Sequence, residues 1–139
     1  MKRLRPCLLL LVLPILAIGL IGCGSNRQLQ SVMLNPAVAD AQNFSGGQVL
    51  FTATGAFNKP PSPIPLASKD VSWCVGSNSG MCVGNINPGV TVDQNGMAQC
   101  ISGFTGTATI LAGVASSSVM NPDTGMQLKI FGAAQLTCP

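Results

Sequence analysis

The chain has 139 residues, a length that fits one domain, and only 8% of them are charged. Its formal net charge of +3 comes from three basic residues near the start, because the four basic and four acidic side chains beyond residue 22 balance. This balance excludes the basic stripe of a nucleic-acid-binding protein and the acidic cluster of a site for hard cations.

The first 22 residues are laid out like a secretory signal peptide. Lys2, Arg3 and Arg5 precede an apolar run over 7–22 that carries no charge. This run is short for a membrane-spanning helix, which needs roughly 20 apolar residues, although an uncleaved N-terminal anchor remains the alternative. The run ends in Leu20-Ile21-Gly22-Cys23, which resembles the lipobox of bacterial lipoproteins.

The resemblance to the lipobox implies how the chain is processed and where it resides. In that family the thiol of the cysteine receives a diacylglycerol, the chain is cut before it, and the new amine is acylated. The resemblance therefore implies a mature protein that begins with lipidated Cys23, is tethered through residues 23–28, and is held at a membrane by acyl chains such as palmitate. Gly24 rather than Asp follows the cysteine, which by the same resemblance favours the outer membrane or the cell surface.

The remaining cysteines agree with export. Cys7 leaves with the signal peptide, and four cysteines stay in the domain: Cys74, Cys82, Cys100 and Cys138. An even number of cysteines in a small exported domain indicates two disulfides. A zinc site is the alternative, but the C-x-x-C spacing is missing and the chain has no His.

Beyond residue 28 apolar and polar residues alternate over short stretches separated by turn residues, which is typical of an all-β domain. The expected strands lie, in chain order, at 29–34, 49–54, 71–73, 90–92, 97–101, 107–112 and 126–138. The side chains expected to face a core are those of Val32, Leu34, Val49, Phe51, Ala53, Val71, Trp73, Ala108, Ile110, Ala112, Met126, Leu128 and Ile130. About seven strands suffice for one β-sandwich over residues 29–139.

Turn and loop residues separate these strands. The prolines from Lys59 to Pro65 exclude a central strand and predict a surface loop. The sequence Asp93-Gln94-Asn95-Gly96 predicts a tight hairpin turn. Long polar loops are expected at 75–88 and 115–125, and Gly132 is expected to break or bulge the last strand.

Several segments, taken in order, resemble a known family. They are Leu29 to Val32 with Asn35-Pro36-Ala37, Gly47 to Gly55, Asp70 to Trp73, Val92 with Asn95 to Ala98, and Gly103 to Ile110. Together they are similar to a bacterial immunoglobulin-like domain of group 2, the type repeated in intimin- and invasin-like adhesins. The resemblance implies a single immunoglobulin-like β-sandwich with Trp73 at the centre between its two sheets. The cysteines and the long insert from Cys74 to Gly89 depart from the family.

The direction of the strands bears on the pairing of the cysteines. If seven strands alternate in direction, the third, fifth and last run the same way and bring Cys74, Cys100 and Cys138 to one pole of the sandwich. Cys82 can return toward Cys74 across a glycine-containing loop. This arrangement favours the pairs Cys74–Cys82 and Cys100–Cys138, and it also permits Cys82–Cys100 with Cys74–Cys138.

The sequence offers no convincing catalytic group. The chain has no His and no Tyr, and its four acidic residues, all Asp, are far apart in sequence. General acid–base catalysis needs a positioned titratable pair, so we expect neither an enzyme nor a cofactor or metal. Loops carry the binding sites of sandwich domains, and the best candidates are the loops at 59–65 and 76–89.

Two classes of function follow from these features. The first is a lipid-tethered, non-catalytic adhesion, interaction or structural module that contacts an envelope protein or polysaccharide and does not bind nucleic acid. The second is an accessory lipoprotein subunit of an export or envelope-assembly machine, in which the domain only docks.

Overall fold

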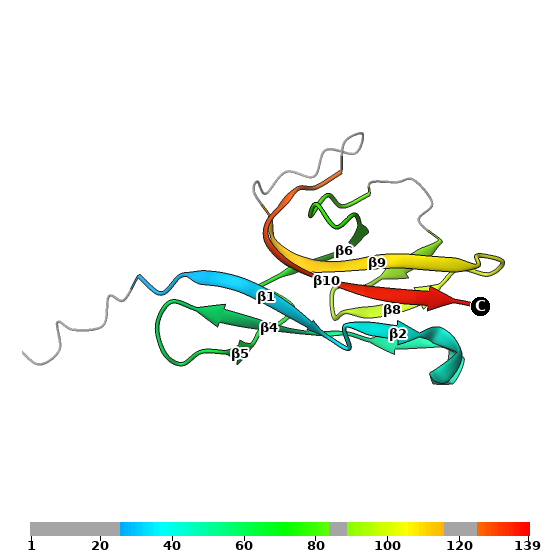
Figure 1. Cartoon of the computed structure of the whole chain (residues 1–139), viewed down its shortest axis with the longest axis horizontal. Coiled ribbons are helices and arrows are strands. Elements are labelled where there is room, and N and C mark those ends of the chain that lie inside the picture. Colours follow the sequence, from blue (N-terminus) through cyan, green and yellow to red (C-terminus); the bar gives the residue numbers. More distant parts are fainter. Residues whose placement is uncertain (1–25, 84–88, 116–124) are drawn as a thin grey trace, which may run out of the picture.

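The structure is a computed structural model that describes residues 26–83, 89–115 and 125–139 (Figure 1). Over these residues the chain forms an all-β sandwich of ten strands with two short 3-10 helices. One layer is a four-stranded sheet in the order β2-β10-β9-β6. The opposite layer consists of two three-stranded sheets, β1-β4-β5 and β3-β8-β7.

The four-stranded sheet contains the two longest strands of the described chain. Its members are β2 (Val38–Asp40), β6 (Ser72–Gly76), β9 (Gly106–Ala115) and β10 (Leu128–Cys138). β9 lies antiparallel between β6 and β10, and β2 pairs in parallel with the end of β10. The expected strands at 71–73, 107–112 and 126–138 therefore fall in one sheet, and β9 and β10 pair over nearly their whole length.

The second layer changes its pairing halfway along one stretch of chain. The expected strand at 49–54 is divided into β3 (Gln48–Leu50), which pairs with β8 (Met97–Cys100), and β4 (Thr52–Phe57), which pairs with β1 (Leu29–Asn35). Between them the Phe51 N–H donates to the Gly96 carbonyl at 2.9 Å. Because Gly96 belongs to the turn before β8, that strand offers no residue beyond Met97 for pairing, and β4 pairs with β1 instead.

The predicted hairpin turn at 93–96 is confirmed. It joins β7 (Val90–Val92) to β8 in an antiparallel pair. The Asp93 carboxylate accepts the backbone N–H groups of Asn95 and Met97, both at 2.8 Å. These bonds lower the pKa of Asp93 below its ordinary value, first of all the bond from Met97, because they stabilise the charged carboxylate.

Two short strands were not expected from the sequence. β2 follows the turn at Asn35-Pro36 and carries the chain from the layer of β1 to the side of β10. β5 (Ile64–Pro65) pairs with β4 at the edge of its sheet, within the region predicted to be a loop. Neither β2 nor β5 is long enough to show an alternation, and neither borders a predicted hairpin turn as β7 does, so only their partners define them.

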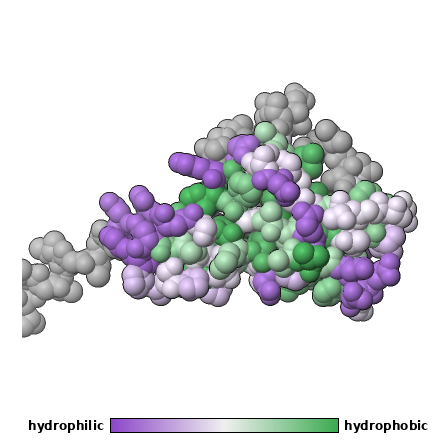
Figure 2. Space-filling view, viewed as in Figure 1, coloured by the Kyte–Doolittle hydropathy of each residue, from purple (hydrophilic) through white to green (hydrophobic). Residues whose placement is uncertain are grey.

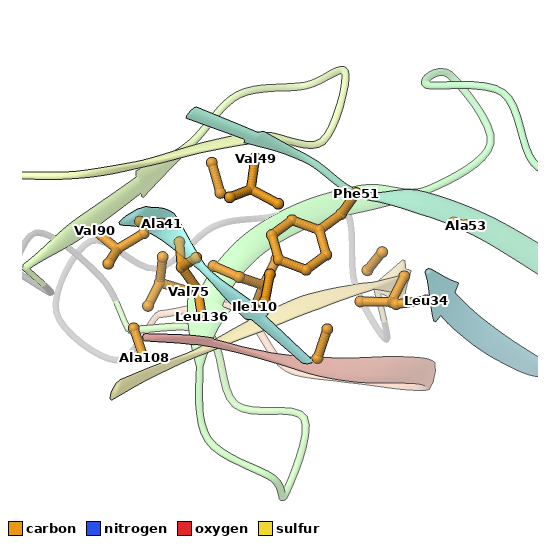
Figure 3. Close-up of a cluster of buried hydrophobic side chains, with 14 of the residues drawn as sticks. Leu34, Ala41, Val49, Phe51, Ala53, Val75, Val90, Ala108, Ile110 and Leu136 are labelled. Atoms are coloured by element: carbon orange, nitrogen blue, oxygen red, sulfur yellow. The ribbon is translucent and has the colours of Figure 1, made fainter. Parts of the chain in front are cut away.

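The main core fills the space between the two layers (Figure 3). Phe51 is fully buried and points into the cluster, toward Ile110 of the opposite layer (Figure 3). The prediction that Trp73 occupies the centre is wrong, because Trp73 is only partly buried and packs against this core from its side. Val75, on the same strand β6, is buried in the main core, whereas the indole of Trp73 lies against Gly96 in the turn before β8.

The remaining residues predicted to face inward from β1, β3, β4 and β9 are buried in the main core: Val32, Leu34, Val49, Ala53, Ala108, Ile110 and Ala112. Val71, which precedes β6, is buried there too. Alternation along these strands was therefore a sufficient guide to which face is covered.

A second, smaller cluster covers the outer face of the four-stranded sheet. It contains Cys74, Cys82, Leu111, Met126 and Leu128, with Ala115 and Phe131 packed against it. The prediction that Met126, Leu128 and Ile130 share one face is wrong, because the register shifts between Leu128 and Ile130. Ile130 consequently packs against the main core.

Gly132 does not bulge the last strand as predicted. It pairs regularly with Ala112, two residues beyond the register shift. A Cβ placed on Gly132 would lie 2.6 Å from the Val32 carbonyl oxygen, so glycine lets β1 cross closely over β10. The close approach of two backbones, rather than a bulge, accounts for glycine at this position.

Candidate functional site

The two ends of the sandwich differ in what they contain. We call the end where the described chain begins the N-terminal end; it consists of residues 26–28 and 57–63. The opposite end, called the C-terminal end, consists of residues 41–47, 100–104 and 139. β1 starts at the first and β10 stops at the second, so the sandwich separates them along its long axis (Figure 1).

At the N-terminal end the first residues are fastened to the loop after β4. The Gln28 N–H donates to the Asn58 Oδ1 at 2.8 Å, and the Asn58 N–H donates to the Gln28 carbonyl at 3.1 Å. The Asn58 side chain also donates to the Asn26 carbonyl at 3.4 Å. Asn58 thereby holds the backbone of residues 26–28 against the domain before β1 begins.

Arg27 and the proline-rich loop form the rest of this end. The Arg27 guanidinium lies 4.0 Å from the centroid of the Phe57 ring, and its Nη2 donates to the Pro61 carbonyl. The Phe57 N–H donates to the Ser62 Oγ at 2.8 Å. The loop proposed from sequence as a binding candidate, at 59–65, is therefore pinned at the point where the chain enters the domain.

The C-terminal end is hollowed. A cavity of about 380 Å³ lies there, within the range of small-ligand sites. None of its lining residues has an ionisable side chain, and Phe44 at its rim is 39% exposed. The lining residues are Ala41, Gln42, Phe44, Gly46, Gly47, Cys100, Ile101, Ser102, Gly103, Phe104 and Pro139. Sequence reasoning did not find this site, because its residues come from two separate turns and from Pro139, with no shared motif.

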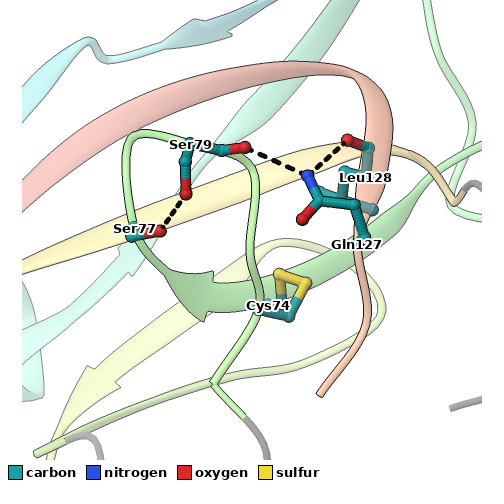
Figure 4. Close-up of a disulfide and its surroundings, with 6 residues drawn as sticks. Cys74, Ser77, Ser79, Gln127 and Leu128 are labelled. Atoms are coloured by element: carbon teal, nitrogen blue, oxygen red, sulfur yellow. Dashed lines mark hydrogen bonds between the residues drawn. A yellow bond between two sulfur atoms is a disulfide. The ribbon is translucent and has the colours of Figure 1, made fainter. Parts of the chain in front are cut away.

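The insert after β6 packs onto the sheet instead of projecting from it (Figure 4). The Leu128 N–H donates to the Gly80 carbonyl at 2.9 Å, and the Cys82 N–H donates to the Met126 carbonyl at 2.8 Å. The Gln127 Nε2 donates to the Ser79 carbonyl at 3.0 Å. The described part of the candidate binding loop at 76–89 thus forms the cover of the second cluster, and residues 84–88 lie outside the described structure.

The structure pairs Cys74 with Cys82 and Cys100 with Cys138, with Cα–Cα distances of 5.6 and 5.9 Å. These are the pairs that the sequence favoured. The expectation of a common pole is wrong, since Cys74 pairs with Leu111 midway along β9 and faces the outer cluster. Cys138 pairs with Gly106 at the start of β9 and faces the main core at the C-terminal end.

Cys23 and the signal-like segment lie outside the described residues. In the described ranges no three His, Cys, Asp or Glu side chains gather where they could hold a metal ion. Those ranges also contain no helix long and apolar enough to cross a membrane.

The fold and its bonds define the class of this protein as an all-β sandwich with two disulfides. No model of a known protein family matches the chain, and no curated protein matches its sequence.

Proposed function

We propose that this chain is a lipid-anchored envelope or cell-surface protein whose single immunoglobulin-like domain is a non-catalytic interaction module. The proposal joins the lipobox-like sequence before Cys23 to an all-β domain that carries two disulfides. Both features suit an exported protein, because disulfides persist in oxidising compartments.

The observation that carries the proposal is the separation of the two ends of the sandwich. The described chain begins at the N-terminal end and β10 stops at the C-terminal end (Figure 1). The residues that line the cavity belong to the C-terminal end. A domain anchored through its first residues would therefore present the cavity away from the membrane. An interaction module benefits from this arrangement, since its partner-binding end stays accessible.

The side chains that line the cavity suit an uncharged partner. Phe44 and Phe104 provide aromatic surface, and Gln42 and Ser102 provide hydrogen-bonding groups. A neutral polysaccharide or an uncharged protein loop matches these groups, because aromatic faces pack on apolar ligand faces while amides and hydroxyls fix the orientation.

The anchor is tested by substitution of Cys23. Cells that express the full chain are grown with a radioactive fatty acid, and the protein is recovered with and without Cys23→Ala. We expect the wild type to carry the label and the variant to accumulate unlabelled, as a precursor or in soluble form. Label retained in the variant would contradict lipidation at Cys23.

The partner-binding role is tested by capture from envelope extract with the mature domain. Bound proteins are identified by mass spectrometry and bound polysaccharide by sugar analysis. We expect Phe44→Ala to weaken capture, whereas Met33→Ala, on the outer face of β1 and 56% exposed, leaves it unchanged. Capture of export components alone would favour the function of an accessory subunit of an export machine. Equal capture by the Phe44→Ala and Met33→Ala variants would exclude the cavity as the partner-binding site.

A further inference from the structure

The reach of the chain before the domain limits how far the domain stands from its anchor. Only Gly24 and Ser25 separate Cys23 from Asn26, where the contacts with the domain begin. Three residues span at most about 11 Å when fully extended. β10, with 11 residues, alone measures about 35 Å. A tether this short keeps the N-terminal end within about 11 Å of the anchored Cys23, whereas the C-terminal end can lie much farther from it.

The tether also has no hinge next to the domain. Asn58 holds the backbone at Asn26 and Gln28 through three hydrogen bonds. Arg27 lies between them and contacts Phe57 and Pro61. Rotation between the anchor and the domain is therefore confined to the two residues before Asn26.

The charge of the N-terminal end is positive. Arg27 and Lys59, two of the four basic residues beyond residue 22, belong to it. Of the three acidic residues that the structure describes, Asp40 is the last residue of β2, Asp70 precedes β6 and Asp93 lies in the hairpin turn, so none belongs to this end. Figure 2 shows hydrophilic side chains gathered where the described chain begins.

We infer that the N-terminal end lies against the phospholipid headgroups and that Arg27 and Lys59 contact an anionic lipid surface. The inference rests on the proposed lipidation of Cys23. Lys59 and the prolines at 60, 61 and 63 are exposed, so this end meets the surface with a pinned loop. Each basic residue near an anionic membrane strengthens binding roughly fivefold. Arg27 and Lys59 therefore favour contact between the N-terminal end and the membrane, which the short tether already keeps close to that end.

The test uses the acylated full-length product, whose lipid is verified by intact mass, reconstituted in vesicles. The vesicles contain phosphatidylcholine alone or phosphatidylcholine with phosphatidylglycerol. Hydrogen exchange is followed over residues 57–62, in which Phe57, Asn58, Lys59 and Ser62 have exchangeable amides, and for comparison at the amides of 99–104. We expect exchange at 57–62 to be several-fold slower on the anionic vesicles than on the neutral ones, and exchange at 99–104 to be the same on both.

Two charge reversals complete the test. Lys59→Glu should abolish the slowing at 57–62, whereas Lys129→Glu, an exposed lysine on β10, should leave it unchanged. An acylated protein that exchanges alike at both ends in both lipids, or that responds equally to both variants, would overturn this inference alone. A product without the lipid mass would overturn the proposed anchor as well.

Discussion

The indole ring of Trp73 lies against Gly96 in the turn between β7 and β8. A Cβ placed on Gly96 would lie 2.8 Å from Cζ2 of the ring and would also collide with the Phe51 carbonyl oxygen. Gly96 has a φ of +83° and accepts the Phe51 N–H through its own carbonyl. The hairpin turn between β7 and β8 thus contacts both the edge strand β6 and Phe51, the residue between β3 and β4.

Gly96→Ala should destabilise the domain more than Gly103→Ala. Both glycines have φ near +80°, but a Cβ at Gly103 meets nothing within 4 Å. Gly103→Ala should therefore cost only the left-handed backbone penalty, about 1–2 kcal/mol. Gly96→Ala should add roughly 1–3 kcal/mol for overpacking. Urea denaturation measures both, and equal losses would contradict the packing of Trp73 on Gly96.

Phe51→Ala should be the most damaging truncation of an aromatic side chain. Phe51 is fully buried, so its loss should lower the free energy of unfolding by about 3–5 kcal/mol. Trp73→Ala should cost less, because Trp73 is partly exposed at the side of the core. Phe44→Ala, at the rim of the cavity, serves as the control with a small effect. A larger loss for Trp73 than for Phe51 would show that the indole is the centre of the core.

The two disulfides should contribute unequally. By chain entropy, Cys100–Cys138, with a separation of 38 residues, should stabilise the fold by about 4 kcal/mol. Cys74–Cys82, with a separation of 8, should contribute about 2.5 kcal/mol. Paired substitutions to Ala, one bond at a time, followed by chemical denaturation, measure the difference. A larger loss of stability on removal of Cys74–Cys82 would indicate that its packing in the second cluster contributes more than the loop that Cys100–Cys138 closes.

Stability should fall in acid partly through Asp93. Hydrogen bonds, first from the Met97 N–H, lower the pKa of the folded carboxyl below its ordinary value of 3.8. The stabilisation is therefore complete above the ordinary value and is lost as the pH falls through the lower pKa of the folded state. Asp93→Asn should flatten the decline of stability below about pH 4. Identical acid dependence in wild type and variant would exclude this role for Asp93.

Much of the local structure could be predicted from the sequence. Alternation identified Val32, Leu34 and Ile110 as core residues, because the side-chain period of a strand leaves only one face to bury. The Asp93–Gly96 turn was predictable, because glycine there accepts a positive φ. Strand direction and loop length favoured the two cysteine pairs that the structure contains. The same reasoning wrongly placed Cys74 at the pole of Cys100 and Cys138.

The tertiary structure alone decided which surfaces meet. No local pattern indicates that β8 begins opposite Leu50, that the register of β10 shifts before Ile130, or that the insert folds back over Leu111. Gly132 and Trp73 were misread for the same reason, since their roles depend on β1 crossing β10 and on the turn at Gly96 lying against β6. The cavity at the C-terminal end likewise exists only where two turns and Pro139 converge. Side-chain alternation specifies the two faces of a strand, whereas its neighbours are selected by contacts between residues far apart in the chain.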